Sequence, residues 1–234
     1  MARSAKSASA AAERRPSLVD DAYAAMKEAI RESTFAPGYQ ASEQEIALRL
    51  GMSRTPVHEA SIRLQEEGLV RIVPKRGIVI CALVPDDIRE IYEVIIALEA
   101  SAAELLARRG PDEREAVAAE LAAATDLMDE AHAVGRLQDW GKADEAFHRL
   151  LVERCGNRRI QRIIQTVNDQ SHRARMLTLK LRRQLPDSVA EHRAIVAAIA
   201  AGNAAAAHAA ARAHRSHARD ELVPLLEDFG LKHF

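Results

Sequence analysis

The sequence predicts a mainly α-helical fold in two parts, an N-terminal winged helix-turn-helix followed by a C-terminal antiparallel all-α helical bundle. Between Ser42 and Gly77 the chain reads as two short helices around a tight turn, followed by a basic β-hairpin. From Pro85 onward the apolar residues recur at helical spacing, and no strand is expected. We therefore expect a flexible tail over residues 1–16, a winged domain over 17–84 and a helical domain over 85–234.

The first helix of the N-terminal pair is predicted to begin at Ser42. Ser42 and Glu45 have the spacing of a capping box, which satisfies free backbone N–H groups at a helix start. Ile46 and Ala47 place apolar side chains on one side of this helix. Gly51 is predicted to form the turn, because glycine adopts left-handed dihedral angles at little cost.

The second helix is predicted to begin after Ser53, whose hydroxyl is expected to cap it. Pro56 suits the first turn, where its missing N–H costs little, and Gly68 is expected to end the segment. Its buried side is predicted to consist mainly of Val57, Ala60, Ile62 and Leu64.

A β-hairpin with a cationic tip is predicted after this helix. Residues 69–73 and 77–80 are rich in β-branched side chains, and they flank Pro74, Lys75 and Arg76. In a winged helix-turn-helix the start of the second helix enters the major groove, where an arginine can donate two hydrogen bonds to guanine. Arg54 is the residue in this position.

Other residues of this region have suitable chemistry for DNA. Thr55 is short enough to contact a phosphate or a thymine methyl group, and Lys75 and Arg76 can reach the DNA backbone or the minor groove. The alternative is an ordinary helical hairpin with solvated charges, because helix-turn-helix patterns alone are weak evidence. The basic hairpin at the correct distance favours DNA binding.

The C-terminal domain is predicted to contain six helices separated by breaks that contain Gly or Pro. In the first of them, one face is formed by Ile88, Ile91, Ile95, Leu98 and Leu105. The helices are expected over residues 85–110, 112–134, 137–154, 158–180, 188–201 and 203–229. The breaks are Gly110-Pro111, Gly135, Cys155-Gly156, Pro186 and Gly202.

Four residues of this domain have the chemistry of metal ligands. Asp144 and His148 lie one turn apart on one predicted helix, so both side chains emerge on the same side. His192 and His214 lie on later helices, where both could face the bundle core. Three imidazoles and a carboxylate suit a divalent ion such as Zn²⁺ or Ni²⁺. Taken singly, each histidine is more often a surface or hydrogen-bonded core residue, so spacing alone leaves both interpretations open.

Composition and charge bear on the number of domains and on the source of DNA affinity. The chain has 234 residues and 48% hydrophobic residues, enough for two folded domains. Residues 1–84 carry 12 Lys+Arg against 10 Asp+Glu, and residues 85–234 carry 21 against 24. DNA affinity must therefore depend on local placement of basic residues instead of a strongly basic chain.

Cysteine use and hydropathy predict the compartment. Cys81 and Cys155 are far apart and form no C-x-x-C pair, so neither a disulfide framework nor a thiolate metal site is expected. No run of about 18 apolar residues is present, so we expect no membrane span. These features favour a cytoplasmic protein.

The segment GMSRTPVHEASIRLQEEGLV, followed by PKRG, resembles the signature of the GntR family of bacterial transcription regulators. The family often has Arg where Gln44 and His58 stand, and both positions are used for DNA contacts in its FadR-like branch. Loss of these arginines is expected to weaken phosphate or guanine contacts. The residues predicted to contact DNA are Ser42, Gln44, Ser53, Arg54, Thr55, His58, Lys75, Arg76 and Gly77.

The segments DEAFHRLLVERCGN and EHRAIVAAIAAGNAAAAHAAARAH resemble the metal-binding subset of the FCD effector domain. This resemblance implies that a divalent metal is held by Asp144, His148, His192 and His214. Many FCD domains also carry an Arg that pairs with an organic acid, and Ile95 stands in its place. A carboxylate could bind the metal directly or pair with Arg173 or Arg175, although both are expected to be solvated. Candidate effector-binding residues are Ile95, Asn168, Arg173 and Arg175.

The sequence thus predicts a homodimeric transcription regulator, a repressor, that binds a double-stranded DNA operator and is not an enzyme. A small metabolite, an organic acid, is expected to bind beside the metal and change the spacing of the two DNA-binding heads. One alternative is a regulator that responds to metal without an organic ligand. Another is a metal-dependent hydrolase or lyase, which lacks an evident general base and leaves the DNA-binding head unexplained.

Overall fold

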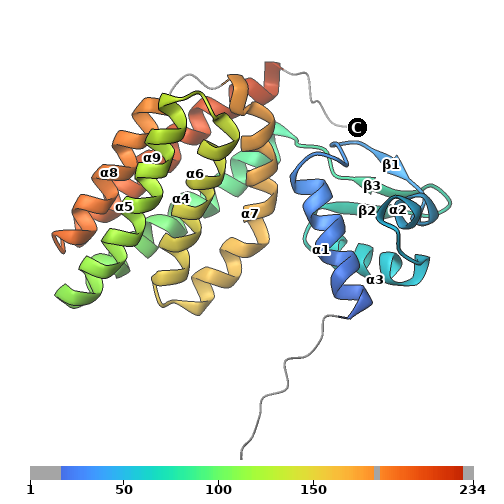
Figure 1. The fold of residues 1–234 in the computed structure, drawn as a ribbon, viewed down its shortest axis with the longest axis horizontal. Helices are drawn as coiled ribbons and strands as arrows, with labels where there is room; N and C mark the ends of the chain where they lie inside the picture. Colours follow the sequence, from blue (N-terminus) through green and yellow to red (C-terminus); the bar gives the residue numbers. More distant parts are fainter. Residues whose placement is uncertain (1–16, 182–184, 229–234) are drawn as a thin grey trace, which may run out of the picture.

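The elements of the chain form two groups in space (Figure 1). The computed structural model describes residues 17–181 and 185–228, and the tail expected over residues 1–16 lies outside them. The first group contains α1 (Leu18–Arg31), β1 (Gln40–Ala41), α2 (Glu43–Leu50), α3 (Arg54–Glu66), β2 (Val70–Val73) and β3 (Gly77–Ile80). The second contains α4 (Pro85–Ala107), α5 (Pro111–Ala133), α6 (Leu137–Arg154), α7 (Arg158–Thr178), a 3-10 turn (Leu179–Leu181), α8 (Leu185–Ala200) and α9 (Ala204–Asp228).

The N-terminal group is a winged helix-turn-helix, as predicted. Its antiparallel sheet has the order β1-β3-β2, and Val73 pairs with Gly77 directly below the tip of the wing. Two elements were not predicted: α1, which begins at a capping box between Ser17 and Asp20, and the two-residue strand β1. Both complete the fold, because α1 packs against α3 and β1 pairs with β3.

The predicted capping box at the start of α2 is present. The Glu45 backbone N–H donates to Ser42 Oγ at 3.2 Å, and the Ser42 backbone N–H donates to Glu45 Oε2 at 2.7 Å. Gly51 ends α2 with φ of 67°, in the left-handed region that glycine tolerates. The helix therefore begins and ends where the sequence indicated.

Two expectations for α3 were wrong. Ser53 stands at the N-cap position, but its side chain makes no capping hydrogen bond. Ile62 is exposed, while Ser61 is fully buried and donates to the Val57 carbonyl oxygen at 2.7 Å. The Ser61 hydroxyl can be buried because it donates to a backbone carbonyl oxygen one turn earlier in the helix. With Ser61 on the inner face of α3, the side chain of Ile62 faces outward.

The C-terminal group is the predicted antiparallel helical bundle. The most extensive helix packing joins α4 with α9, and α5 packs on both α6 and α8. Helix α4 ends at Ala107, shortly before the expected break at Gly110-Pro111. Helix α8 begins at Leu185, earlier than expected, so Pro186 lies in its first turn and not before it. The expected end of α9 at residue 229 lies outside the described residues.

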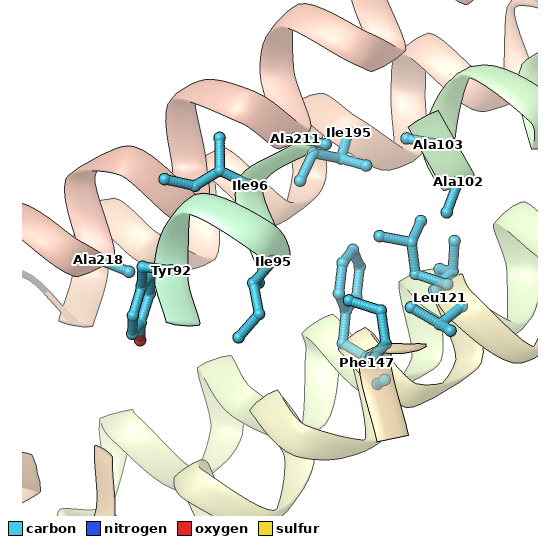
Figure 2. Packing of buried hydrophobic residues seen from close by; sticks show 14 of the residues in the cluster. Tyr92, Ile95, Ile96, Ala102, Ala103, Leu121, Phe147, Ile195, Ala211 and Ala218 are labelled. Carbon is cyan, nitrogen blue, oxygen red and sulfur yellow. The ribbon is translucent and has the colours of Figure 1, made fainter. Parts of the chain in front are cut away.

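Two separate hydrophobic cores hold the chain together. One core lies within residues 22–80 and the other runs from Leu83 to Leu226. In the bundle, Ile95 points from α4 into the packed interior that also contains Phe147 of α6 and Leu121 of α5 (Figure 2). Leu98 and Leu105, expected on the same buried face as Ile95, are only partly buried and pack at its edge. Within the described parts of the chain, each helix is too short or too polar to cross a membrane.

Helix α7 connects the two groups, because it lies beside α1 (Figure 1). Asp169 of α7 forms an ion pair with Lys27 of α1 at 2.6 Å. Arg31 of α1 donates to both Asp169 and Glu145 of α6. The side chains of this cluster are largely buried, so the winged domain is joined to the bundle through charged contacts on α6 and α7.

Candidate functional site

The residues predicted to contact DNA lie on an exposed surface of the winged domain. Gln44 is at the start of α2, and Arg54, Thr55 and His58 are exposed on the first turns of α3. Lys75 and Arg76 are exposed at the wing tip. Recognition helix and wing thus present basic or polar side chains of suitable size for a duplex.

Ser42 and Gly77 have structural roles in this domain. The Ser42 hydroxyl takes part in the cap of α2. Gly77 has φ of 89°, and a Cβ there would lie 2.4 Å from the backbone oxygen of Ala41. This glycine therefore allows the start of β3 to pass close to the end of β1.

The four predicted metal ligands are brought together inside the bundle. Asp144 and His148 come from α6, His192 from α8 and His214 from α9, and all four side chains are buried. One potential ligand atom from each residue lies within 4.8 Å of the others. Three helices distant in sequence thus converge on one point.

Each histidine of this cluster is oriented through its Nδ1 atom. His148 Nδ1 lies 2.9 Å from Glu99 Oε2, His192 Nδ1 lies 2.7 Å from the Ser188 carbonyl oxygen, and His214 Nδ1 lies 2.8 Å from Glu191 Oε2. An ionised carboxylate and a carbonyl oxygen only accept hydrogen bonds, so each Nδ1 carries the proton. The Nε2 lone pairs of the neutral rings are consequently free, which is the tautomer a metal requires.

The Nε2 atoms approach one another closely. His148 Nε2 lies 3.1 Å from His192 Nε2 and 3.2 Å from His214 Nε2. Asp144 Oδ1 lies 3.6 Å from the Nε2 of His148 and 3.7 Å from that of His192. With metal–ligand bonds of about 2.1 Å, ligand atoms of a tetrahedral site are about 3.4 Å apart. Neutral lone pairs at this separation repel unless a cation or proton lies between them, so the donor set fits a divalent ion.

Burial supports the protonation states that metal binding needs. It lowers the pKa values of His192 and His214 well below the usual range, and neighbouring imidazoles add to this effect. Burial alone would raise the pKa of Asp144, but its contacts with His148, Arg175 and His192 hold it well below its usual value. The cluster therefore contains an ionised carboxylate beside the neutral imidazoles of His192 and His214.

A buried ion pair supports His148 from behind. Glu99 accepts hydrogen bonds from Arg215 Nε at 2.7 Å and from Arg215 Nη2 at 2.6 Å. Burial disfavours the Glu99 carboxylate, but Arg215 and His148 outweigh this and lower its pKa. Glu99 therefore remains charged and holds the His148 ring in one orientation.

The expectation that Arg173 and Arg175 are solvated was wrong, because both are buried. Arg175 Nη1 lies 3.7 Å from Asp144 Oδ2, and neither Nη atom of Arg175 has a hydrogen-bond partner among the described residues. Arg173 Nη2 donates instead to the Cys81 carbonyl oxygen at 2.6 Å, in the segment between β3 and α4. Burial lowers the pKa of Arg173 to about 10. Only Arg175 of this pair faces the four-residue cluster.

The other candidate effector residues lie in different surroundings. Ile95 is buried in the core of the bundle. Asn168 lines a cavity of about 140 Å³ beside His148 and Glu99. It also lines a cavity of about 440 Å³ between α7 and the winged domain, whose wall includes Tyr23, Lys27 and Glu67.

Comparison with known proteins decides the family. Residues 18–80 match the model for bacterial regulatory proteins of the gntR family, and residues 90–217 match the FCD domain. The chain belongs to the GntR family and carries an FCD domain. It is a DNA-binding transcription regulator and not an enzyme.

Relatives agree with this GntR assignment. An HTH-type transcriptional regulator in the TAR-I ttuE-ttuC' intergenic region of Agrobacterium vitis is 58% identical over 134 residues, which are 57% of this chain and 78% of the relative. The HTH-type transcriptional repressor GlaR of Escherichia coli is 25% identical over 208 residues, 83% of this chain and 90% of the relative. A GntR regulator structure from Rhodococcus sp. RHA1 has a TM-score of 0.74 at 26% identity, covering 88% of this chain and 97% of that one.

Several residues of the GntR site were missed by sequence reasoning. Glu99 and Glu191 orient two histidines, and Ser188 orients the third through its backbone. Glu43 contacts both Arg54 and His58. Glutamates on exposed-looking helix faces give no distinct pattern, although Glu191 directly precedes His192 and could have been noticed.

Proposed function

We propose that this GntR regulator is a homodimeric repressor whose FCD domain holds a divalent metal, Zn²⁺ or Ni²⁺, and an organic acid that modulates operator binding. The observation that carries the proposal is the convergence of three Nε2 atoms and one carboxylate next to Arg175, whose Nη atoms have no hydrogen-bond partner among the described residues. The proposed metal ligands are Asp144, His148, His192 and His214. This protein would act in the cytoplasm, where the operator DNA is found.

The proposed ligand class rests on Arg175. Its guanidinium group is buried, and among the described residues it forms no hydrogen bond, although it lies 3.7 Å from Asp144. A buried cation without hydrogen bonds is costly, and a carboxylate is the geometry that a guanidinium matches best. An organic acid could place one oxygen on the metal and another on Arg175, which would replace the arginine that is absent at Ile95.

The proposed DNA contacts are those of the exposed surface, with Arg54 as the residue that reads a guanine. A two-fold dimer presents two such surfaces and reads two half-sites, so only certain head separations fit the duplex. An effector shifts this equilibrium only if it binds one arrangement better than the other. Repression is proposed by analogy with the relative that is named a repressor.

The test is a mobility-shift titration with the intergenic DNA that adjoins the gene, using metal-free protein, metal-loaded protein and a panel of organic acids. We expect specific retardation that an organic acid changes only with metal-loaded protein. Asp144→Ala should lose bound metal, and Arg175→Ala should keep the metal but lose the response to the acid. Retardation of the metal-loaded protein that no organic acid changes would contradict the effector proposal.

A second candidate is a regulator that responds to metal alone, which the same four ligands favour. It predicts that adding or removing the metal changes operator affinity without an organic acid, and that Arg175→Ala leaves this response intact. Chelation followed by stepwise addition of Zn²⁺ or Ni²⁺ in the same titration separates the two proposals.

A further inference from the structure

We infer that Glu43 is a positioning residue for DNA recognition, because it holds Arg54 and His58 in the orientation that reads bases and thereby sets operator specificity. This inference rests on the proposed role of Arg54. No sequence pattern identified Glu43, which is an acidic residue in a surface expected to bind an acidic polymer.

The carboxylate of Glu43 joins the two helices of the helix-turn-helix. Arg54 Nε donates to Glu43 Oε2 at 2.7 Å, and His58 Nδ1 lies 2.6 Å from Glu43 Oε1. The side chain of Glu43 is only 13% exposed, against 69% for Arg54 and 50% for His58. The acid is therefore covered by the two side chains it binds, and their outer atoms face solvent.

This contact determines which atoms of Arg54 remain available. A guanidinium group has five N–H donors, and the Nε–H bond to Glu43 uses one of them. The two Nη groups are left on the outward edge, and two parallel donors are what guanine O6 and N7 require. Free in solution, an arginine side chain samples many rotamers, so the anchor also reduces the ordering needed on binding.

The same carboxylate orients His58. An ionised Glu43 only accepts, so His58 Nδ1 carries the donated proton and His58 Nε2 is the ring nitrogen left for DNA. The hydrogen bond from His58, together with that from Arg54, lowers the pKa of Glu43 despite partial burial, so the acid stays ionised. Arg54 and His58 are thus fixed relative to each other by one shared partner.

A purely electrostatic role for Glu43 makes a different prediction about sequence discrimination. A carboxylate close to DNA repels phosphates, so its removal should strengthen binding to every duplex alike. If Glu43 positions Arg54, its removal should strengthen binding to nonspecific DNA but weaken discrimination between operator and mutated operator. The ratio of the affinity for the operator to the affinity for the mutated operator therefore separates a positioning role from a purely electrostatic role.

The experiment uses the full-length protein and an operator selected by the wild type from a randomised duplex pool. Dissociation constants are measured for this operator, for versions with each guanine replaced by adenine, and for an unrelated duplex of equal length. For Glu43→Gln we expect about tenfold loss of discrimination at the guanine read by Arg54, since a good bidentate pair is worth about 5- to 160-fold in discrimination. Affinity for the unrelated duplex should rise about twofold or more.

Glu59→Gln is the matched control for charge. Glu59 is exposed on α3 next to His58 and makes no hydrogen bond or ion pair with the described part of the chain. The Glu59→Gln variant should bind nonspecific DNA more tightly but keep the wild-type ratio of affinities for operator and mutated operator. Equal loss of discrimination in Glu43→Gln and Glu59→Gln, or no loss in Glu43→Gln, would overturn the inference.

A double-mutant cycle separates failure of this inference from failure of the proposed role of Arg54. Arg54→Ala should lose discrimination at one guanine, and adding Glu43→Gln should cause no further loss at that position. Unchanged discrimination in Arg54→Ala would refute base reading by Arg54. If Arg54→Ala loses discrimination and Glu43→Gln adds a further loss at the same guanine, the positioning role of Glu43 is refuted, while base reading by Arg54 stands. Circular dichroism and the melting temperature check that α2 persists in each variant.

Discussion

Glu99 of α4 and His148 of α6 are 49 residues apart in sequence, yet they form a buried hydrogen bond of 2.9 Å that fixes which nitrogen of His148 faces the other ligands. The same carboxylate binds Arg215 of α9. Three helices are therefore linked through one acid directly behind the proposed metal site. Stability and metal affinity should depend on the same residue.

Replacing this acid should affect both properties. We expect Glu99→Gln to lower metal affinity by about 10–100-fold, because the amide keeps an acceptor oxygen but lacks the negative charge that raises the basicity of His148 as a ligand. It should also lower the free energy of unfolding by about 3–5 kcal/mol, because the Arg215 charge stays buried without its counter-ion. Competition with a chromophoric chelator and chemical denaturation measure the two effects. Glu104→Gln, at a more exposed acid on the same helix, is the control and should change neither quantity appreciably.

Acid should destabilise the metal-free protein below the ordinary pKa of histidine. Burial, helped by the charge of Arg175, lowers the pKa of His172 to about 4. Between that value and about 6.5 the unfolded chain binds a proton that the folded protein does not, so the free energy of unfolding falls as pH falls. His192 and His214 act in the same direction.

This pH dependence can be assigned by one substitution. For His172 alone, the expected loss at pH 5.5 is on the order of 1 kcal/mol. Urea denaturation of wild type and His172→Gln at pH 7.5 and 5.5, with chelator present, measures it. His172→Gln should show the smaller pH dependence, and identical profiles for the two proteins would refute the prediction.

The start of β3, next to the tip of the wing, should not tolerate a side chain at Gly77. A Cβ there would meet the Ala41 backbone oxygen at 2.4 Å and Ser42 Cα at 2.9 Å, and both belong to backbone that cannot swing aside. We expect Gly77→Ala to destabilise the winged domain by about 3 kcal/mol, from the strained dihedral angle plus the clash. Gly38→Ala is a matched control, since Gly38 has a similar φ of 78° but nothing within 4 Å of a Cβ. It should cost about 1 kcal/mol, and equal losses in the two variants would contradict the clash.

Removing Arg31 should loosen the junction between the domains. Arg31 of α1 donates to Glu145 and Asp169, and its side chain is only 17% exposed. We expect Arg31→Ala to lower the free energy of unfolding by about 2 kcal/mol, because two charge-assisted hydrogen bonds are lost in a partly buried position. Arg154→Ala removes an exposed ion pair with Glu120 and should change stability by less than about 1 kcal/mol. Similar melting temperatures for both variants would contradict a role for Arg31 in holding the domains together.

Local signals predicted much of this fold. The capping box at Ser42 and the left-handed Gly51 placed α2 within a residue, because both act through neighbours in the chain. Helix α1 has an equally clear capping box at Ser17 and could have been predicted from it. Strand β1 could not, because two residues carry no periodicity and Gln40 and Ala41 become a strand only by pairing with β3.

The proposed metal site was only partly accessible from sequence. Asp144 and His148 are one helical turn apart, so their proximity follows from local geometry. The approach of His192 and His214 depends on how α8 and α9 pack, and family resemblance had to supply it. The burial of Arg175 was missed because arginines on a strongly polar helix are normally solvated, whereas this side chain lies inside the bundle beside Asp144.

Different side chains of helix α7 contact the winged domain and the proposed metal site. Asp169 pairs with α1, and Arg173 binds the Cys81 carbonyl oxygen at the exit of the wing, whereas Arg175 approaches Asp144. Docking and the proposed effector binding thus use different side chains of one helix. Substitutions around residue 175 would therefore change ligand preference during evolution without altering the contacts that attach the winged domain to α7.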